Sequence, residues 1–267
     1  MKNKGRFLFP KMQKPARENH IFRGDIMIFL CFANADRYTI AEPVLYHFEN
    51  FGIPMWYDRH SLIIGDNREE VNFKEGIISQ SYCVLIITKN IESNICANEE
   101  IQIVKAQYEL EKMRVFPILY NITADELPPK YCWMKEIIYR EVTDKSGTLK
   151  TVSSIAYRYL KDKLQFFPYK NLFDMKDNIP DAYLNCLLKM YYSIDNNNLN
   201  AKMAILYCFN HYMYSIIDKK LPLYCVKPFE LLFSKTKLNI EIDFKELSIL
   251  ETCTMLSIKE SGLGNIV

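Results

Sequence analysis

Three unbroken apolar stretches constrain the fold of this chain more than any other feature. They read DIMIFLCF (25–32), SYCVLIIT (81–88) and RVFPILYN (114–121), and IPMWY (53–57) is a shorter fourth. A strand that is covered on both faces is apolar throughout, whereas a strand with one face in water alternates apolar and polar residues. These stretches therefore predict the strands of a buried parallel sheet.

The segments between these stretches have helical patterns. Residues 38–52 end at Gly52, a residue type that often follows a helix, and residues 68–80 and 97–113 carry apolar positions at helical spacing. Alternation of strands and helices at this spacing is typical of a doubly wound α/β fold. We therefore expect a flavodoxin-like doubly wound parallel sheet over residues 23–163.

The pattern changes after about residue 165, where strand-like stretches give way to helical ones. Helices are expected at 171–180, 181–194, 200–217 and 244–258. They are divided by the polar DNNNLN and by the proline-containing KLPLYCVKPFE. We expect a smaller all-α region over residues 168–267, whose aromatic and Met side chains form a packed core. Residues 1–22 are interpreted as a partly ordered leader.

Composition excludes several classes of function. The 267 residues have a formal net charge of +2, which gives no reason to expect nucleic acid or an anionic membrane as a partner. No apolar run approaches the roughly 20 residues that span a bilayer. The eight cysteines occur singly, without CxxC pairs or clustered His, so no metal site is expected. A reducing cytoplasm suits this usage best.

Aromatic and acidic side chains follow the predicted strands where each strand ends. Phe32 and Asp36 follow the first, Trp56 and Asp58 end the second, and SNICANEE (93–100) follows the third. In open α/β sheets, ligands bind outside the carboxyl ends of the strands. These residues would project from that one edge, which makes it the candidate site.

At these positions the chain resembles a bacterial Toll/interleukin-1 receptor (TIR) domain. The matching motifs, in chain order, are MIFLCFANAD, GIPMWYDRHSLIIGD, IISQSYCVLIITKNI, SNICANE and VFPILYNITADELP. Two positions depart from the family pattern, because Ile95 stands where Trp is usual and Glu100 where Leu or Ile usually follows the glutamate. The resemblance covers about half of the chain and says little about the helical region.

The resemblance implies cleavage of NAD at the bond between nicotinamide and ribose. Nicotinamide leaves as a neutral molecule, so one carboxylate that stabilises the oxocarbenium-like ribose is sufficient. The family motif places that carboxylate on Glu99, and a register shifted by one places it on Glu100. Both could instead be first-turn acids that the helix dipole favours.

Four further residues are candidates for binding the substrate. Phe32 and Trp56 would line the nicotinamide site or belong to the core. Asp58 would bind a ribose hydroxyl or cap its loop, and Asp36 would contact the ligand or cap a helix. NAD is expected as substrate and no cofactor is expected.

The resemblance also implies partners and a biological setting. We expect a homo-oligomer formed through TIR contacts and, by analogy with Thoeris-like antiviral systems, a separate effector that reads an ADP-ribose-derived product. A suicidal NAD glycohydrolase is the other enzymatic reading. The alternative from another class is a non-enzymatic TIR scaffold that acts by self-association, and nucleoside transfer in a related fold is a third.

Overall fold

A five-stranded parallel sheet forms, and four of its strands lie within the predicted apolar stretches. The computed structural model describes residues 27–238 and 240–263 and orders the strands β2-β1-β3-β4-β5. The strands are β1 (Ile28–Cys31), β2 (Met55–Trp56), β3 (Tyr82–Ile87), β4 (Arg114–Tyr120) and β5 (Arg140–Val142). Every neighbouring pair is parallel. This strand order is that of the flavodoxin-like doubly wound fold, so the predicted fold class is confirmed.

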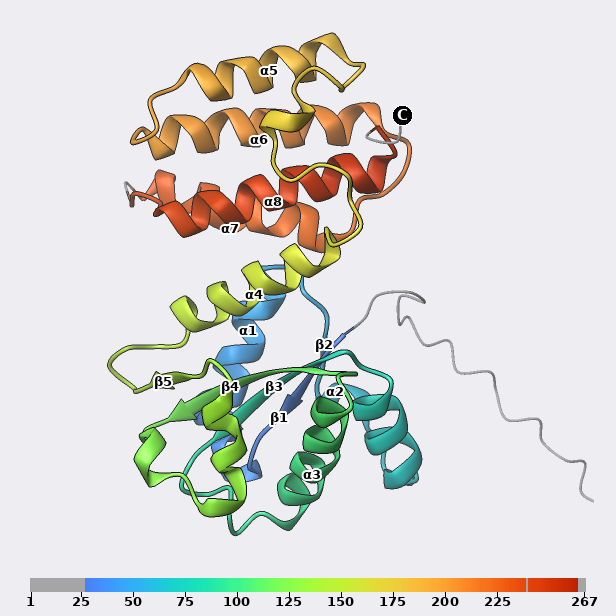
Figure 1. The fold of residues 1–267 in the computed structure, drawn as a ribbon, viewed down its shortest axis with the longest axis vertical. Coiled ribbons are helices and arrows are strands. Elements are labelled where there is room, and N and C mark those ends of the chain that lie inside the picture. The colour runs from blue at the N-terminus through green and yellow to red at the C-terminus, as the bar shows by residue number, and fades with distance from the viewer. Residues whose placement is uncertain (1–26, 239, 264–267) are drawn as a thin grey trace, which may run out of the picture.

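Helical segments cover both faces of this sheet (Figure 1). On one face, α1 (Glu42–Asn50) and α4 (Leu149–Lys163) pack against the strands, and on the other face η3 (Glu69–Ile78) and α3 (Ile95–Glu109) do so. Short helical turns complete this part: η1 (Asn34–Asp36), η2 (Arg37–Ala41), α2 (Asp58–Ser61), η4 (Ala124–Glu126) and η5 (Pro129–Glu136). The two apolar cores lie on either side of the strands.

Within the described residues, four α-helices follow the sheet, as the change of pattern after residue 165 predicts. They are α5 (Ala182–Ser193), α6 (Leu199–Ile216), α7 (Leu223–Lys237) and α8 (Phe244–Ser261). Figure 1 shows them stacked beyond α4, and the core of that face continues from the strands into α8 without a break. The domain limits 23–163 and 168–267 stay predictions, and the leader at 1–22 lies outside the described residues.

The sequence predicted that the proline-containing segment KLPLYCVKPFE divides two helices. This prediction is wrong. Most of the segment belongs to α7, with Pro228 inside the helix. Proline has no N–H to donate, so it leaves the carbonyl four residues earlier without its helical partner. In this helix that carbonyl belongs to Tyr224, and the buried Cys253 thiol donates to it over 3.3 Å. The helix is therefore tolerated because α8 supplies the missing donor.

Two further elements differ from the sequence prediction. Residues 171–180 form only the short turn η6 (Phe173–Met175), because their polar side chains bond to nearby backbone groups; Asn171 Oδ1, for example, accepts from the Asp174 N–H. Strand β5 was not expected, since Arg140–Val142 is short and carries exposed charges at the edge of the sheet.

Gly52 fixes the contact between α1 and the start of α7. Its φ of +67° is the left-handed conformation that glycine adopts readily just beyond a helix. A Cβ at this position would lie 2.5 Å from the backbone carbonyl carbon of Leu223. The absence of a side chain thus lets the helical region approach the sheet closely. A mostly apolar cavity of about 450 Å³ lies beside this contact.

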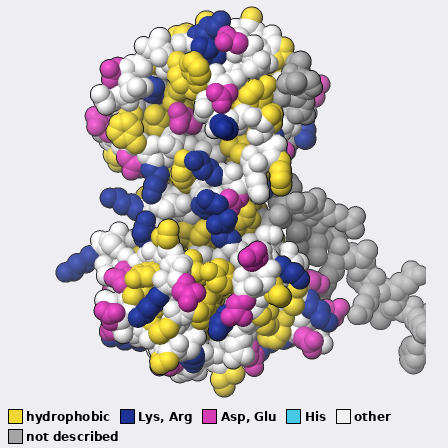
Figure 2. Space-filling model, in the orientation of Figure 1, with side chains coloured by type: hydrophobic (Ala, Val, Ile, Leu, Met, Phe, Trp, Pro, Cys, Tyr) yellow, Lys and Arg dark blue, Asp and Glu magenta, His cyan; other side chains and the backbone are white. Residues whose placement is uncertain are grey.

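The surface view shows two lobes that meet at a narrower middle (Figure 2). Lys and Arg side chains gather around that middle on the face shown. No helix in the described part of the chain is long and apolar enough to cross a membrane.

Candidate functional site

The carboxyl ends of β1, β2 and β3 meet at one edge of the sheet, as their parallel order requires. Beyond them lie the turn η1, the short helix α2 that begins at Asp58, and the residues that lead from β3 to α3. Strand order reverses between β1 and β3, and doubly wound sheets bind their ligands outside such a switch point. The side chains gathered at this edge are therefore the candidate site.

The first two turns of α3 determine which way the two glutamates point. Both glutamates lie in the second turn and no acidic residue lies in the first, so the reading of them as first-turn acids is wrong. Asn94 is the N-cap, and its Oδ1 accepts a hydrogen bond from Ala97 N at 2.9 Å. Ala97 and Ile101 are buried against the sheet. Glu100 lies three residues after Ala97 and next to Ile101, so it points toward the sheet and is half-buried. Glu99 points outward.

Glu100 is held by neutral groups. Asn72 in η3 donates its Nδ2 to Glu100 Oε1 over 2.8 Å, and the Cys31 thiol at the end of β1 also bonds to this carboxyl. No Lys or Arg forms an ion pair with it within the described ranges. Burial raises the pKa of Glu100, against the opposing effects of these two hydrogen bonds and of the nearby Arg68. The result is a carboxyl group short of counter-charge.

Glu99 has the opposite environment. Its side chain is 47% exposed and forms an ion pair of 2.6 Å with Arg68. The Arg68 guanidinium also lies over the Phe73 ring, 4.9 Å from its centre. The predicted primary carboxylate therefore lies at the outer rim with its charge neutralised, while the alternative in the shifted register faces the sheet.

Asp58 is part of a second charged group at this edge. Arg37 donates to both of its carboxylate oxygens, at 2.7 and 2.6 Å. The guanidinium lies against the rings of Phe32 and Tyr57, 5.0 and 5.4 Å from their centres. The hydrogen bonds from Arg37 to Asp58 raise the pKa of the guanidinium above its usual value. This bidentate pair ties η2 to the start of α2.

The two predicted aromatic residues lie on opposite faces of the sheet. Phe32 is buried and stacks on Tyr57, with ring centres 5.9 Å apart. Trp56 is buried on the other side, tilted against Phe29 at 5.1 Å. Consecutive residues of a strand point to opposite faces, so Tyr57, not Trp56, shares the side of Phe32.

Asp36 links the loops that follow β1 and β3. Its side chain is buried and accepts hydrogen bonds from Asn90 Nδ2, at 2.6 Å, and from the Thr88 hydroxyl. It does not cap the helical segment that follows it. The carboxylate therefore fixes the geometry of this edge.

Comparison with known proteins shows which family this part of the chain resembles. Residues 28–152, just under half of the chain, match the TIR domain family. This segment is therefore similar to TIR domains. A solved TIR domain, that of the Toll-related receptor TRR-2 from Hydra magnipapillata, aligns at 17% identity with a TM-score of 0.38, covering 52% of this chain and 97% of that one.

Two curated relatives match the TIR domain at low identity. The NAD(+) hydrolase TcpC of Escherichia coli O6:H1 (strain CFT073) is 25% identical over 134 residues, which is 49% of this chain and 43% of that protein. The NAD(+) hydrolase TcpA of a Theionarchaea archaeon (strain DG-70-1) is 22% identical over 100 residues, 38% of this chain and 30% of that protein. The chain thus spans less than half the length of either relative.

Sequence reasoning missed three residues of this edge of the TIR domain: Arg37, Arg68 and Asn72. Arg37 follows the first motif directly, and its position next to Asp36 was the available signal. Arg68 and Asn72 lie one helical turn apart in a segment that carries no family motif. Only the packing of η3 against α3 shows that both reach the two glutamates.

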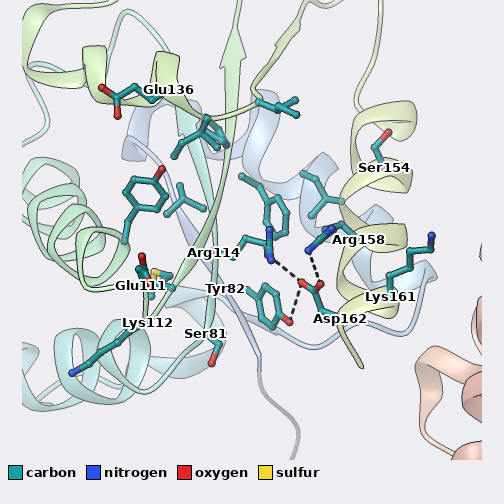
Figure 3. A pocket seen from close by; sticks show the side chains of 18 of the residues that line it. Ser81, Tyr82, Glu111, Lys112, Arg114, Glu136, Ser154, Arg158, Lys161 and Asp162 are labelled. Carbon is teal, nitrogen blue, oxygen red and sulfur yellow. Dashed lines mark hydrogen bonds and ion pairs between the residues drawn. The ribbon is translucent and has the colours of Figure 1, made fainter. Parts of the chain in front are cut away.

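The opposite edge of the TIR sheet carries a large groove (Figure 3). Its volume is about 1280 Å³, and it lies between the amino ends of β3 and β4 and one side of α4, from Thr151 to Asp162. Asp162 accepts from Arg114 and Arg158, each at 3.0 Å, and from the Tyr82 hydroxyl at 3.4 Å. Burial, and then the charge of Asp162, raise the pKa of Tyr82 to about 12.

The residues that line this groove include five Lys or Arg and four Asp or Glu, so its charges nearly balance, with one positive charge in excess. Among the described residues, no cluster of three or more His, Cys, Asp or Glu could hold a metal ion.

Proposed function

We propose that this protein cleaves NAD at the nicotinamide–ribose bond, with Glu100 as the carboxylate that stabilises the transition state. The observation that carries the proposal is a half-buried carboxyl group, short of counter-charge, at the ligand-binding edge of a TIR sheet. Both curated relatives that match this domain are named NAD(+) hydrolases, which supports the same reaction.

The reaction suits a single carboxylate. The C1′–N bond of the nicotinamide ribose breaks, and its electron pair leaves with nicotinamide, which becomes neutral. A water oxygen then bonds to C1′ and one proton goes to solvent, which gives ADP-ribose. Positive charge develops on the ribose in between, and an anion held close to it in a partly dry site stabilises that charge strongly.

The choice of Glu100 over Glu99 rests on helix phase and on charge. Ala97, Ile101 and Val104 form the buried face of α3, and Glu100 lies next to that face. The carboxylate of Glu99 is already neutralised by its ion pair with Arg68. The roles of Phe32, Asp36, Trp56 and Asp58 as substrate contacts stay predictions; the Arg37–Asp58 pair gives Asp58, at least, a rigid place at the rim of the site.

The biological setting is a further part of this proposal. We place the activity in antiviral defence in the cytoplasm, either by depletion of NAD or by production of an ADP-ribose-derived signal that a separate effector reads. Self-association through the TIR domain would complete the active form. Protection of cells against phage by the wild-type gene, lost with Glu100→Gln, is the expected outcome of a plaque assay.

The direct test is NAD consumption by the full chain at high protein concentration, with products resolved by mass spectrometry. Wild type, Glu100→Gln and Glu99→Gln are compared side by side. Loss of turnover in Glu100→Gln alone supports the proposal, and the product mass separates hydrolysis from cyclisation. Loss in Glu99→Gln alone would assign the role to the other register, and no turnover in any assembled wild-type sample would contradict the enzymatic function.

A TIR scaffold is the second candidate, and exposed apolar side chains favour it. Ile63 and Ile64 in the loop after α2 are 61% and 105% exposed, and Ile95, where the family usually has Trp, is 75% exposed. Such side chains suit contacts between copies. A scaffold would self-assemble equally well as wild type, Glu99→Ala and Glu100→Ala, and none of the three would consume NAD.

A further inference from the structure

Two bridges join η3 and its lead-in to the second turn of α3. The outer bridge is the ion pair between Arg68 and Glu99, with side chains 41% and 47% exposed. The inner bridge is the hydrogen bond from Asn72 to Glu100. Arg68 and Asn72 lie one turn apart on one segment, and Glu99 and Glu100 are neighbours on the other. The outer bridge therefore screens the inner one from solvent.

The inner bridge leaves one polar atom without a partner. Asn72 is only 3% exposed, and the atom that faces the Glu100 carboxylate must be its Nδ2, because a carboxylate only accepts. Its Oδ1 is buried and has no hydrogen-bond partner within the described part of the chain. Buried polar atoms are nearly always paired, so an orphan acceptor beside a candidate catalytic group points to a donor that arrives from outside.

The chemistry of that donor follows from the proposed substrate. Near the bond that breaks, the nicotinamide ribose of NAD presents its 2′- and 3′-hydroxyls, and both can donate. An exposed ion pair such as the outer bridge is worth about 0–1 kcal/mol, so it opens readily and admits the ribose. A hydroxyl at the Asn72 oxygen would then lie beside the Glu100 carboxylate.

Resting on the proposed function, we propose that Asn72 is a positioning and specificity residue of this site. Its amide nitrogen orients Glu100, and its free oxygen accepts a hydrogen bond from a hydroxyl of the nicotinamide ribose. Other groups act on Glu100 as well: Cys31 from the sheet, Arg68 from the lead-in to η3 and Asp58 from α2.

The test compares NAD with analogues that lack the 2′- or the 3′-hydroxyl of the nicotinamide ribose. We expect wild type to prefer NAD over at least one analogue and Asn72→Ala to lose about tenfold of that preference in kcat/KM. The matched control is Asn185→Ala, since Asn185 in α5 also has a buried, unpartnered Oδ1. This control is expected to keep the full preference.

Asn72→Asp separates the two roles and keeps the shape of the side chain. It retains an acceptor oxygen, so the preference for the hydroxyl should persist, but it places a second carboxyl beside Glu100. The acidic limb of the kcat/KM profile should therefore move to higher pH.

The outcomes distinguish this inference from the function on which it rests. Wild-type turnover with unchanged discrimination in Asn72→Ala overturns the role in specificity. An acidic limb that stays in place in Asn72→Asp overturns the role in positioning. Absence of turnover in assembled wild type overturns the proposed function and, with it, both roles.

Discussion

The two edges of the sheet hold carboxyl groups in opposite conditions. At the amino edge, Asp162 accepts from two arginines and a tyrosine beside a groove of about 1280 Å³. At the carboxyl edge, Glu100 has an amide and a thiol but no ion pair among the described residues. A fully compensated carboxylate holds structure together, whereas an uncompensated one retains its attraction for a cationic substrate. The charge environment of a carboxyl group, more than the volume of the nearest groove, therefore indicates a candidate catalytic site.

The largest expected effect comes from Glu100→Gln. This change removes the negative charge but keeps the size of the side chain and its hydrogen bond to Asn72. Turnover of NAD is expected to fall by a factor of about 100 or more, since electrostatic stabilisation of the transition state is lost. Initial rates at saturating NAD measure it. Turnover of NAD by Glu100→Gln at the wild-type rate would contradict the catalytic role of the carboxyl edge.

The pH dependence of kcat/KM gives the second effect. Burial raises the pKa of Glu100 above its ordinary value of 4.5. Because the ionised form is the active one, the rate should rise with pH through that raised pKa and drop about tenfold per unit below it. An acidic limb centred at or below pH 4.5 would contradict the assignment of Glu100.

Asp162→Asn probes the amino edge. It leaves Arg114 and Arg158 without their shared partner, and the half-exposed arginines moderate the cost. The free energy of unfolding is expected to fall by about 1–2 kcal/mol. Urea denaturation measures it, with NAD turnover as the companion readout, which should stay at the wild-type level. Lost turnover in a folded variant would show that the amino edge takes part in catalysis.

Stability against pH distinguishes Glu100 in another way. The folded chain keeps the proton of Glu100 at pH values where the unfolded chain has released it, so stability falls as pH rises through the raised pKa. Glu100→Gln removes this loss and should melt at a higher temperature than wild type at pH 7. The two melting curves should converge below pH 4.5, and a lower melting temperature of the variant at pH 7 would oppose the prediction.

The smallest effect is expected for Glu99→Gln. An exposed ion pair contributes about 0–1 kcal/mol, so turnover should stay within about fivefold of wild type. NAD turnover of Glu99→Gln and of Glu100→Gln, measured under identical conditions, tests which of the two glutamates is needed for catalysis.

The sequence predicts the strands of the fold well because their signal is local. Runs such as 81–88 are apolar throughout since both faces are covered, and β3 forms within that run. Strand β5 lacks this signal because an edge strand of three residues buries little. Helix α7 escaped prediction for another reason: Pro228 reads as a breaker, and only Cys253 from a distant helix makes it acceptable.

The candidate site could be predicted in outline only. The motif places a glutamate near the start of α3, but adjacent residues of a helix differ by about 100° in direction, so the way the helix packs determines which one faces the sheet. The structure shows that Ala97, Ile101 and Val104 form the buried face. Asn72 and Arg68 could not be found at all, because their importance depends on how η3 packs against α3.

Helix α4 has a practical consequence for anyone who dissects this protein. It is covered by the sheet and α1 on one side and by α8 on the other, where Lys245 Nζ bonds to Ser154 Oγ at 2.7 Å and Lys259 Nζ to the Lys163 carbonyl at 2.6 Å. A recombinant fragment that ends after α4 would present to water the apolar surface that α8 normally covers. Dimers or filaments of such a fragment would result from this newly exposed surface and not from the native contacts. Assembly should therefore be studied in the full chain.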